Sequence, residues 1–175
     1  MKKFLFALPL IVAVPLLAQS GPMQPPGAPD AARVTAGTYK ADPNHTLVGW
    51  RVNHLGFNDY FGIFGDVTGT LVLDPKNPGA AKVDITVPVS RVTTANAALT
   101  AHLLRAGKDG GKPDFFGPAP ADARFVSTSV TVSGTTARIA GNLTLNGVTK
   151  PVTLDAGFAG AGTTPAFMGG KETVG

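Results

Sequence analysis

The sequence predicts an all-β domain, on three observations. Apolar and polar residues alternate with period two through most of the chain from Thr38 onward. Glycine and proline are abundant, with 22 and 15 of 175 residues, and both destabilise the interior of a helix. The segments between alternating runs are short and rich in turn residues. Consecutive strands of this kind favour a closed barrel or a sandwich over a parallel α/β sheet.

The first residues have the composition of a targeting segment. Lys2 and Lys3 precede an apolar run over residues 4–18, and Ala18-Gln19-Ser20 resembles a small-x-small cleavage site. The run contains two prolines and is shorter than the roughly 20 residues that span a bilayer. Residues 1–20 are therefore expected to be a signal peptide, and the mature protein to be periplasmic or secreted without a stable membrane anchor.

The mature chain divides into a linker and one domain. Residues 21–33 are rich in proline and glycine and predict an extended linker, followed by a single domain over residues 34–175. Loss of Lys2 and Lys3 with the leader lowers the net charge from +4 to +2, which weakens the case for nucleic acid as a partner. The absence of cysteine excludes a disulfide framework, thiolate metal sites and a cysteine nucleophile.

The elements follow in order along the domain. Strands are predicted over residues 47–54, 67–74, 82–89, 125–133 and 138–145, with a return strand that reaches Phe158. Asn146-Gly147 predicts a tight hairpin turn between the last two strands. Residues 93–105 have helical spacing, with Thr94 or Asn96 as the cap and Gly107 as the end, so one short helix is expected within the strands.

The inner face of these strands is apolar. In a small barrel such a face either packs solid or encloses one ligand cavity. Gly69 and Gly141 fall at inward positions, where they are expected to leave room, which favours a cavity.

Little in the sequence indicates catalysis. His45, His54 and His102 do not have the spacing of a metal site, no serine lies in a strained nucleophile turn, and Glu172 is the one glutamate. We therefore expect no enzyme, no catalytic residue and no metal. A metal-binding or stress-related periplasmic module that uses the three histidines is the alternative, and a solid β-domain that binds a protein partner is a third.

Aromatic residues gather between two of the predicted strands, over residues 55–65, and again at Phe115-Phe116. Such residues either plug the core or ring the mouth of an apolar cavity. The sequence leaves both interpretations open.

Three groups of segments form a pattern in a fixed order along the chain. The opening group is at residues 39–46 (YKADPNHT), 50–56 (WRVNHLG) and 62–65 (GIFG). The middle group is at residues 101–104 (AHLL), 114–116 (DFF) and 124–125 (RF), and the hairpin is at residues 141–152 (GNLTLNGVTKPV). Together these segments resemble the YceI-like family. The resemblance implies an extended, antiparallel, lipocalin-like β-barrel that binds an isoprenoid quinone or a polyprenyl phosphate in a periplasmic or secreted bacterial protein.

The chain departs from the family pattern in places. Residues 107–112 lengthen the link after the helix, and Thr46 replaces the usual serine. The family pattern continues into a further strand after the point where this sequence ends at Gly175, so we expect either that the sequence is a fragment or that the barrel lacks its closing strand.

The resemblance and the strand parity together give a candidate ligand site. The bound isoprenoid lipid is expected in the lumen, no other cofactor is required, and a homodimer is compatible with the sequence. For the head group, His54 is preferred over His45 and over Arg51, which parity turns outward. The expected lumen and mouth residues are Val48, Trp50, Val52, His54, Phe57, Phe61, Phe64, Leu71, Ile85, Val87, Leu103, Phe115, Phe116, Leu143 and Leu154.

Overall fold

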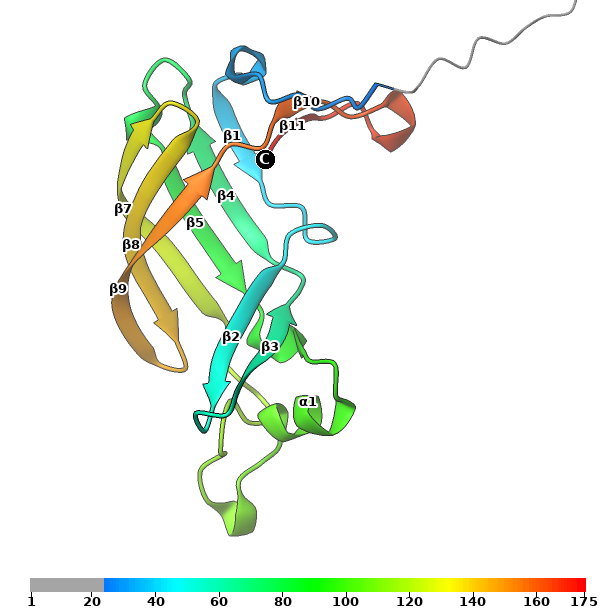
Figure 1. The fold of residues 1–175 in the computed structure, drawn as a ribbon, viewed down its shortest axis with the longest axis vertical. Coiled ribbons are helices and arrows are strands. Elements are labelled where there is room, and N and C mark those ends of the chain that lie inside the picture. The colour runs from blue at the N-terminus through cyan, green and yellow to red at the C-terminus, as the bar shows by residue number, and fades with distance from the viewer. Residues whose placement is uncertain (1–23) are drawn as a thin grey trace, which may run out of the picture.

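The structure is a computed structural model that describes residues 24–175, so the expected signal peptide lies outside the described residues. The strands form three antiparallel sheets (Figure 1). The large sheet has the order β1 (Gly37–Lys40), β4 (Thr68–Leu73), β5 (Lys82–Val87), β7 (Ala123–Ser133), β8 (Thr136–Leu145), β9 (Val148–Gly157). The second sheet contains β2 (Val48–His54), β3 (Asn58–Phe64) and β6 (Val92–Thr93), and the third β10 (Ala161–Thr163) and β11 (Glu172–Val174).

One α-helix interrupts the strands, as the sequence predicts. Helix α1 spans Ala97–Leu104, and the side chain of Asn96 caps it by accepting a hydrogen bond from the Leu99 amide at 3.0 Å. The helix is shorter than predicted because Thr93 pairs with Ile63 in β6 and Arg105 is already extended. Short 3-10 turns lie at Ala31–Arg33, Pro78–Ala80, Val89–Arg91, Lys108–Gly110 and Ala166–Met168. None of the described helices is long and apolar enough to cross a bilayer.

The all-β class, the antiparallel pairing and the single helix are confirmed, whereas the described strands do not close into a barrel. Strands β1 and β9 are the two edges of the large sheet, and each pairs with one neighbour, β4 and β8 respectively. Figure 1 shows this sheet as a curved wall, with the β2–β3 hairpin and α1 toward its lower end and β10–β11 at its upper end.

The aromatic stretch after β2 is a strand rather than a loop, which corrects the sequence interpretation. Residues Asn58–Phe64 form β3 and pair with β2 over seven residue pairs, from Val48 opposite Phe64 to His54 opposite Asn58. The turn spans residues 55–57, and Leu55 and Gly56 are both at positive φ, 56° and 81°. Leucine rarely adopts this conformation, so the turn lacks the Asn-Gly or Asp-Gly pair that usually marks a hairpin.

The predicted Asn146-Gly147 turn is present between β8 and β9. Both residues have positive φ, 50° and 76°, as a tight hairpin of this type requires. The turn fixes a register of ten residue pairs in which Leu145 lies opposite Val148. This register decides which side chains of β9 face inward.

The main core lies where α1 and the β2–β3 hairpin meet the large sheet. Its buried residues are Phe64, Val67, Val87, Val89, Val92, Leu103 and Ala123, and Trp50, Ile85 and Phe116 are among the partly buried side chains that pack against them. The rings of Phe64 and Phe116 meet edge to face with centroids 6.1 Å apart. Three of the expected mouth residues, Phe64, Leu103 and Phe116, are therefore parts of the core.

The inward glycines do not leave room, contrary to the sequence expectation. A side chain at Gly141 would overlap the ring of Phe125, and one at Gly69, which has φ 134°, would overlap the backbone at Asp84 and Ile85. Both glycines thus permit close packing within the sheet.

The described part of the predicted linker packs against the C-terminal strands. Ala28 pairs with Ala161 of β10, and the guanidinium of Arg33 donates to the carbonyl oxygens of Pro26 and Ala161 at 3.2 and 3.4 Å. Asp30 caps the short turn that follows. These contacts bring the start of the domain to the upper end of the large sheet.

Candidate functional site

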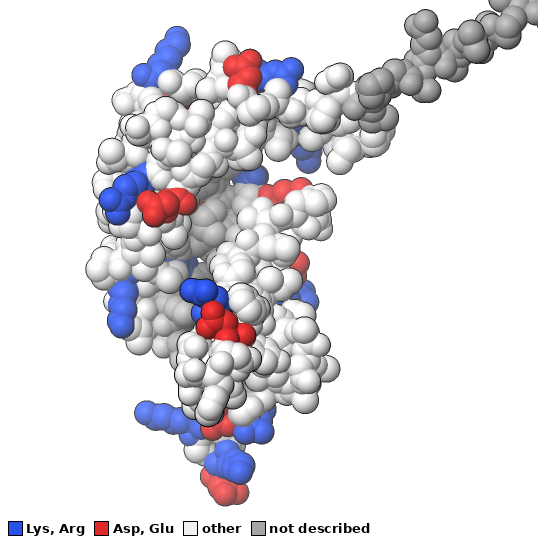
Figure 2. Space-filling view, in the orientation of Figure 1, with Lys and Arg blue, Asp and Glu red and all other residues white. Residues whose placement is uncertain are grey.

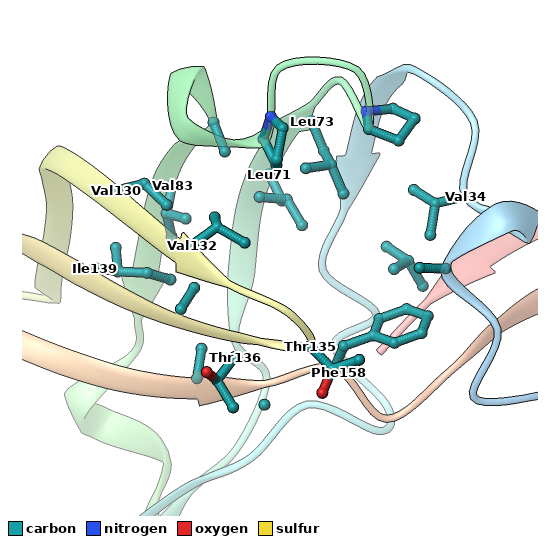
Figure 3. Close-up of a pocket in the computed structure, with 18 of the residues that line it drawn as sticks. Val34, Leu71, Leu73, Val83, Val130, Val132, Thr135, Thr136, Ile139 and Phe158 are labelled. Carbon is teal, nitrogen blue, oxygen red and sulfur yellow. The ribbon is translucent and has the colours of Figure 1, made fainter.

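An apolar cavity of about 380 Å³ opens on the inner face of the large sheet, at the end where β7 turns into β8 (Figure 3). Its volume lies within the range of small-molecule pockets, about 300–1,000 Å³. None of the lining side chains is charged, and Thr135 and Thr136 are its polar members. The apolar side chains that line it include Val34, Leu71, Leu73, Val83, Val130, Val132, Ile139, Ala156 and Phe158.

Strand pairing brings these side chains to one face. Directly paired residues of neighbouring strands share a face, as Leu71 and Val83 do in β4 and β5, or Ile139 and Leu154 in β8 and β9. In β7 the register shifts between Ser127 and Ser129. Because this bulge reverses the alternation, Val130 pairs with Ile139 and faces the cavity.

One of the predicted ligand residues, Leu71, lines this cavity. Ile85, Leu143 and Leu154 lie on the same face of the sheet outside the lining, as their pairings show. Val87 shares the face but is buried in the core. The inner face thus continues from the cavity toward the core as an apolar surface.

The hairpin residues divide between two faces. The pairs Val48–Phe64 and Trp50–Gly62 place Val48, Trp50, Val52 and His54 on the face that meets the core. Phe61 pairs with Arg51 on the opposite face and is 62% exposed, and Phe57 beside the turn is 86% exposed. Phe57 and Phe61 are therefore not brought to the cavity.

Below the core, an acidic residue joins the helix to the loop that follows it. Asp114 Oδ2 lies 2.8 Å from both His102 Nε2 and Arg105 Nη2. The hydrogen bond from Arg105, followed by that from His102, lowers the pKa of Asp114 below its ordinary value. The His102 ring also meets Phe115 edge to face, with centroids 5.2 Å apart. This arrangement holds Phe115 against α1, away from the cavity lining.

The three histidines have separate surroundings. His45 Nδ1 lies 2.7 Å from Asp42, His102 contacts Asp114, and His54 lies near the β2–β3 turn. The His45 contact is the main cause that lowers the pKa of Asp42. Within residues 24–175, no group of three or more histidine, cysteine, aspartate or glutamate side chains could hold a metal ion.

The sequence reasoning missed most of the cavity lining, although some of the signal was present. Leu73, Val83, Ile139, Ala156 and Phe158 continue the alternation of predicted inward residues in their own strands. Val130 and Val132 could not be placed by alternation because the bulge intervenes. Val34 comes from the segment before β1, and no periodic pattern marks it.

The sequence of this chain is similar to those of known proteins. Residues 39–174 match the YceI-like domain. The chain is 42% identical over 145 residues to Protein YceI of Escherichia coli O17:K52:H18, covering 81% of this chain and 71% of that protein. It is 43% identical over 140 residues to Protein YceI of Salmonella arizonae, covering 78% and 69%.

Solved structures give the same result for the fold. A crystal structure of the Campylobacter jejuni YCEI protein is similar with a TM-score of 0.53 and 29% identity, over 78% of this chain and 75% of that one. Burkholderia cenocepacia BcnA is similar in fold alone, with a TM-score of 0.52 and 19% identity over 77% of each chain. The matched domain, the curated relatives and the shared fold show that this chain belongs to the YceI-like family.

Proposed function

We propose that this protein is a periplasmic or secreted binding protein, not an enzyme, that holds a long isoprenoid-type lipid on the inner face of its large sheet. The lipid is an isoprenoid quinone or a polyprenyl phosphate. The observation that carries the proposal is the cavity whose lining is apolar and contains no charged side chain.

Family membership supports the same proposal, because the YceI-like fold is a lipid- and polyisoprenoid-binding fold. An isoprenoid chain needs no hydrogen bonds from its host, so Leu71, Val83 and Ile139 suffice to hold it. The binding free energy would come mainly from buried apolar area, at about 25 cal/mol per Å² before the costs of ordering the lipid.

The apolar surface outside the cavity fits a ligand longer than the cavity itself. Leu143 and Leu154 continue the inner face, and Leu154 is an exposed large hydrophobic side chain. An exposed apolar surface next to a pocket is typical of a binding groove. We propose that the isoprenoid tail ends in the cavity and that the rest of the lipid lies along this surface.

Organic extraction of the full-length purified protein, followed by mass spectrometry, tests the proposal. We expect a long-chain isoprenoid at near-stoichiometric amount, or uptake of ubiquinone or undecaprenyl phosphate when either is added in detergent. Protein that yields no lipid and takes up neither compound would contradict the proposal.

A histidine-dependent metal module is the competing function. It predicts stoichiometric zinc or copper retention that is lost when His45, His54 and His102 are all replaced by alanine. Measurement of bound metal in the wild type and in this variant separates the two functions. If the protein binds lipid, the three replacements should not change its metal content.

A further inference from the structure

The inner face of the large sheet carries a lysine. Lys150 of β9 lies directly opposite Leu143 of β8. Leu143 in turn lies opposite Phe125 of β7, a buried residue whose own partner in β5 is Ile85. Directly paired residues in antiparallel strands point to the same face. These paired residues therefore place Lys150 on the face that contains the cavity and the core.

All other charged residues of these six described strands lie on the opposite face. The pairing registers give this set as Lys40, Lys82, Asp84, Arg124, Arg138 and Asp155. Within it, Arg124 pairs with Asp84 at 2.6 Å and Arg138 with Asp155 at 3.4 Å. Figure 2 shows charged side chains scattered over a mostly uncharged surface. Lys150 is exposed and forms no ion pair with a carboxylate of the described residues.

A lipid that covers the inner face removes water from this ammonium group. A charge that loses water without gaining a partner is strongly unfavourable. Since the sheet supplies no carboxylate on this face, the compensating charge has to come from the ligand. A quinone head group is neutral, whereas a phosphate is anionic and accepts charge-assisted hydrogen bonds from an ammonium.

We infer that Lys150 binds the anionic head group of the lipid, which is therefore an isoprenoid phosphate and not a quinone. This inference rests on the proposed function and names the class of ligand and a residue that recognises it. It replaces His54 as the principal head-group residue.

The position of Lys150 also fixes how the lipid lies. Ala156 of the same strand lines the cavity and lies six positions along β9 from Lys150. At about 3.3 Å per residue this span is about 20 Å. Figure 1 shows the β8–β9 turn, close to Lys150, at the opposite end of the sheet from the β7–β8 turn beside the cavity. The phosphate and the tail end of the lipid thus occupy opposite ends of the inner face.

Undecaprenyl phosphate and undecaprenol test the inference, because their tails are identical and they differ in the phosphate. Binding of both is measured by tryptophan fluorescence or by co-purification with the full-length protein. The variants are Lys150→Gln and, as a matched control, Lys82→Gln, which removes a lysine from the outer face. We expect Lys150→Gln to weaken the binding of undecaprenyl phosphate about tenfold, because one charge-assisted hydrogen bond is lost. The affinity for undecaprenol should not change. Lys82→Gln should change neither affinity.

Four outcomes would overturn the inference. If Lys150→Gln binds undecaprenyl phosphate as the wild type does, Lys150 is not the head-group residue, although lipid binding stands. An equal loss for both lipids would assign Lys150 a structural role. If inorganic phosphate displaces undecaprenyl phosphate at a concentration similar to that of the lipid, the site binds free anions and not the lipid head group. If the wild type binds neither lipid, the proposed function itself fails, and the inference fails with it.

Discussion

The indole of Trp50 occupies the space that a side chain at residue 62 would need. Trp50 of β2 lies directly opposite Gly62 of β3, and the nearest atoms to a Cβ built on Gly62 belong to the indole. The ring crosses the neighbouring strand and packs against the core cluster. Glycine in a strand commonly marks such a close approach.

Gly62→Ala is therefore expected to displace Trp50 and destabilise the protein by about 1–3 kcal/mol, the usual cost of overpacking. Trp50 is the single tryptophan, so its fluorescence should shift in the folded state. Chemical denaturation followed by fluorescence measures both effects. Gly49→Ala is the control, since a Cβ at Gly49 on the same hairpin meets nothing within 4 Å. Equal stability of the two variants would show that the indole does not depend on Gly62.

Gly147 is needed for its backbone conformation rather than for space. A side chain there meets nothing within 4 Å, yet its φ of 76° is unfavourable for any residue with a Cβ. Gly147→Ala should lower the free energy of unfolding by about 1–2 kcal/mol. Gly157→Ala, at a position with open space and no positive φ, should change it by less than about 0.5 kcal/mol. The reverse order of stabilities in urea denaturation would contradict this account of the turn.

Asp114 makes stability depend on acid pH. Its pKa is lowered in the folded protein, mainly by Arg105, so its stabilising contribution is present above the ordinary aspartate pKa of about 3.9 and is lost as the pH falls through the lowered value. Asp114→Asn should reduce the melting temperature at pH 5–7, roughly the range of greatest stability, and the difference from the wild type should close toward strongly acid pH. Thermal melts across pH measure this gap.

Asp109→Asn is the control for that series. It lies in the same loop, and its carboxylate forms no ion pair within the described part of the chain. Its melting temperature should follow the wild type at each pH. A gap for Asp114→Asn that stays constant with pH would rule out the ion pair as its cause.

The fold was predictable where alternation and turn residues agree. Asn146-Gly147 and the strands on either side of it follow from local rules that the structure does not override. Strand β3 was not predictable in this way, because its turn uses Leu55 at positive φ and its aromatic residues are divided between a buried face and an exposed one. An exposed Phe61 and a buried Phe64 cannot be told apart by composition.

The candidate site was less predictable than the fold. Inward residues were correctly assigned in β4, β5, β8 and β9, but the sequence gives no indication of which part of the inner face stays open. Core packing around Phe64 and Leu103 fills one end, and the cavity remains at the other. Lys150 was not predicted as a site residue, because its face depends on the register that the hairpin turn sets.

The bulge in β7 separates two valines that test whether the inner face of the large sheet holds the lipid. Val126 and Val132 belong to the same strand and are each 38% exposed, but Val132 lines the cavity and Val126 faces outward opposite Asp84. Val132→Gln places an amide without a partner against the lipid, which costs about 1–3 kcal/mol. Val126→Gln places the same amide in solvent.

The deciding measurement is the affinity of undecaprenyl phosphate for these two variants and for the wild type. We expect Val132→Gln to weaken binding about tenfold or more and Val126→Gln to bind as the wild type does. Equal affinity of all three proteins, or a loss confined to Val126→Gln, would contradict the assignment of the inner face as the lipid site.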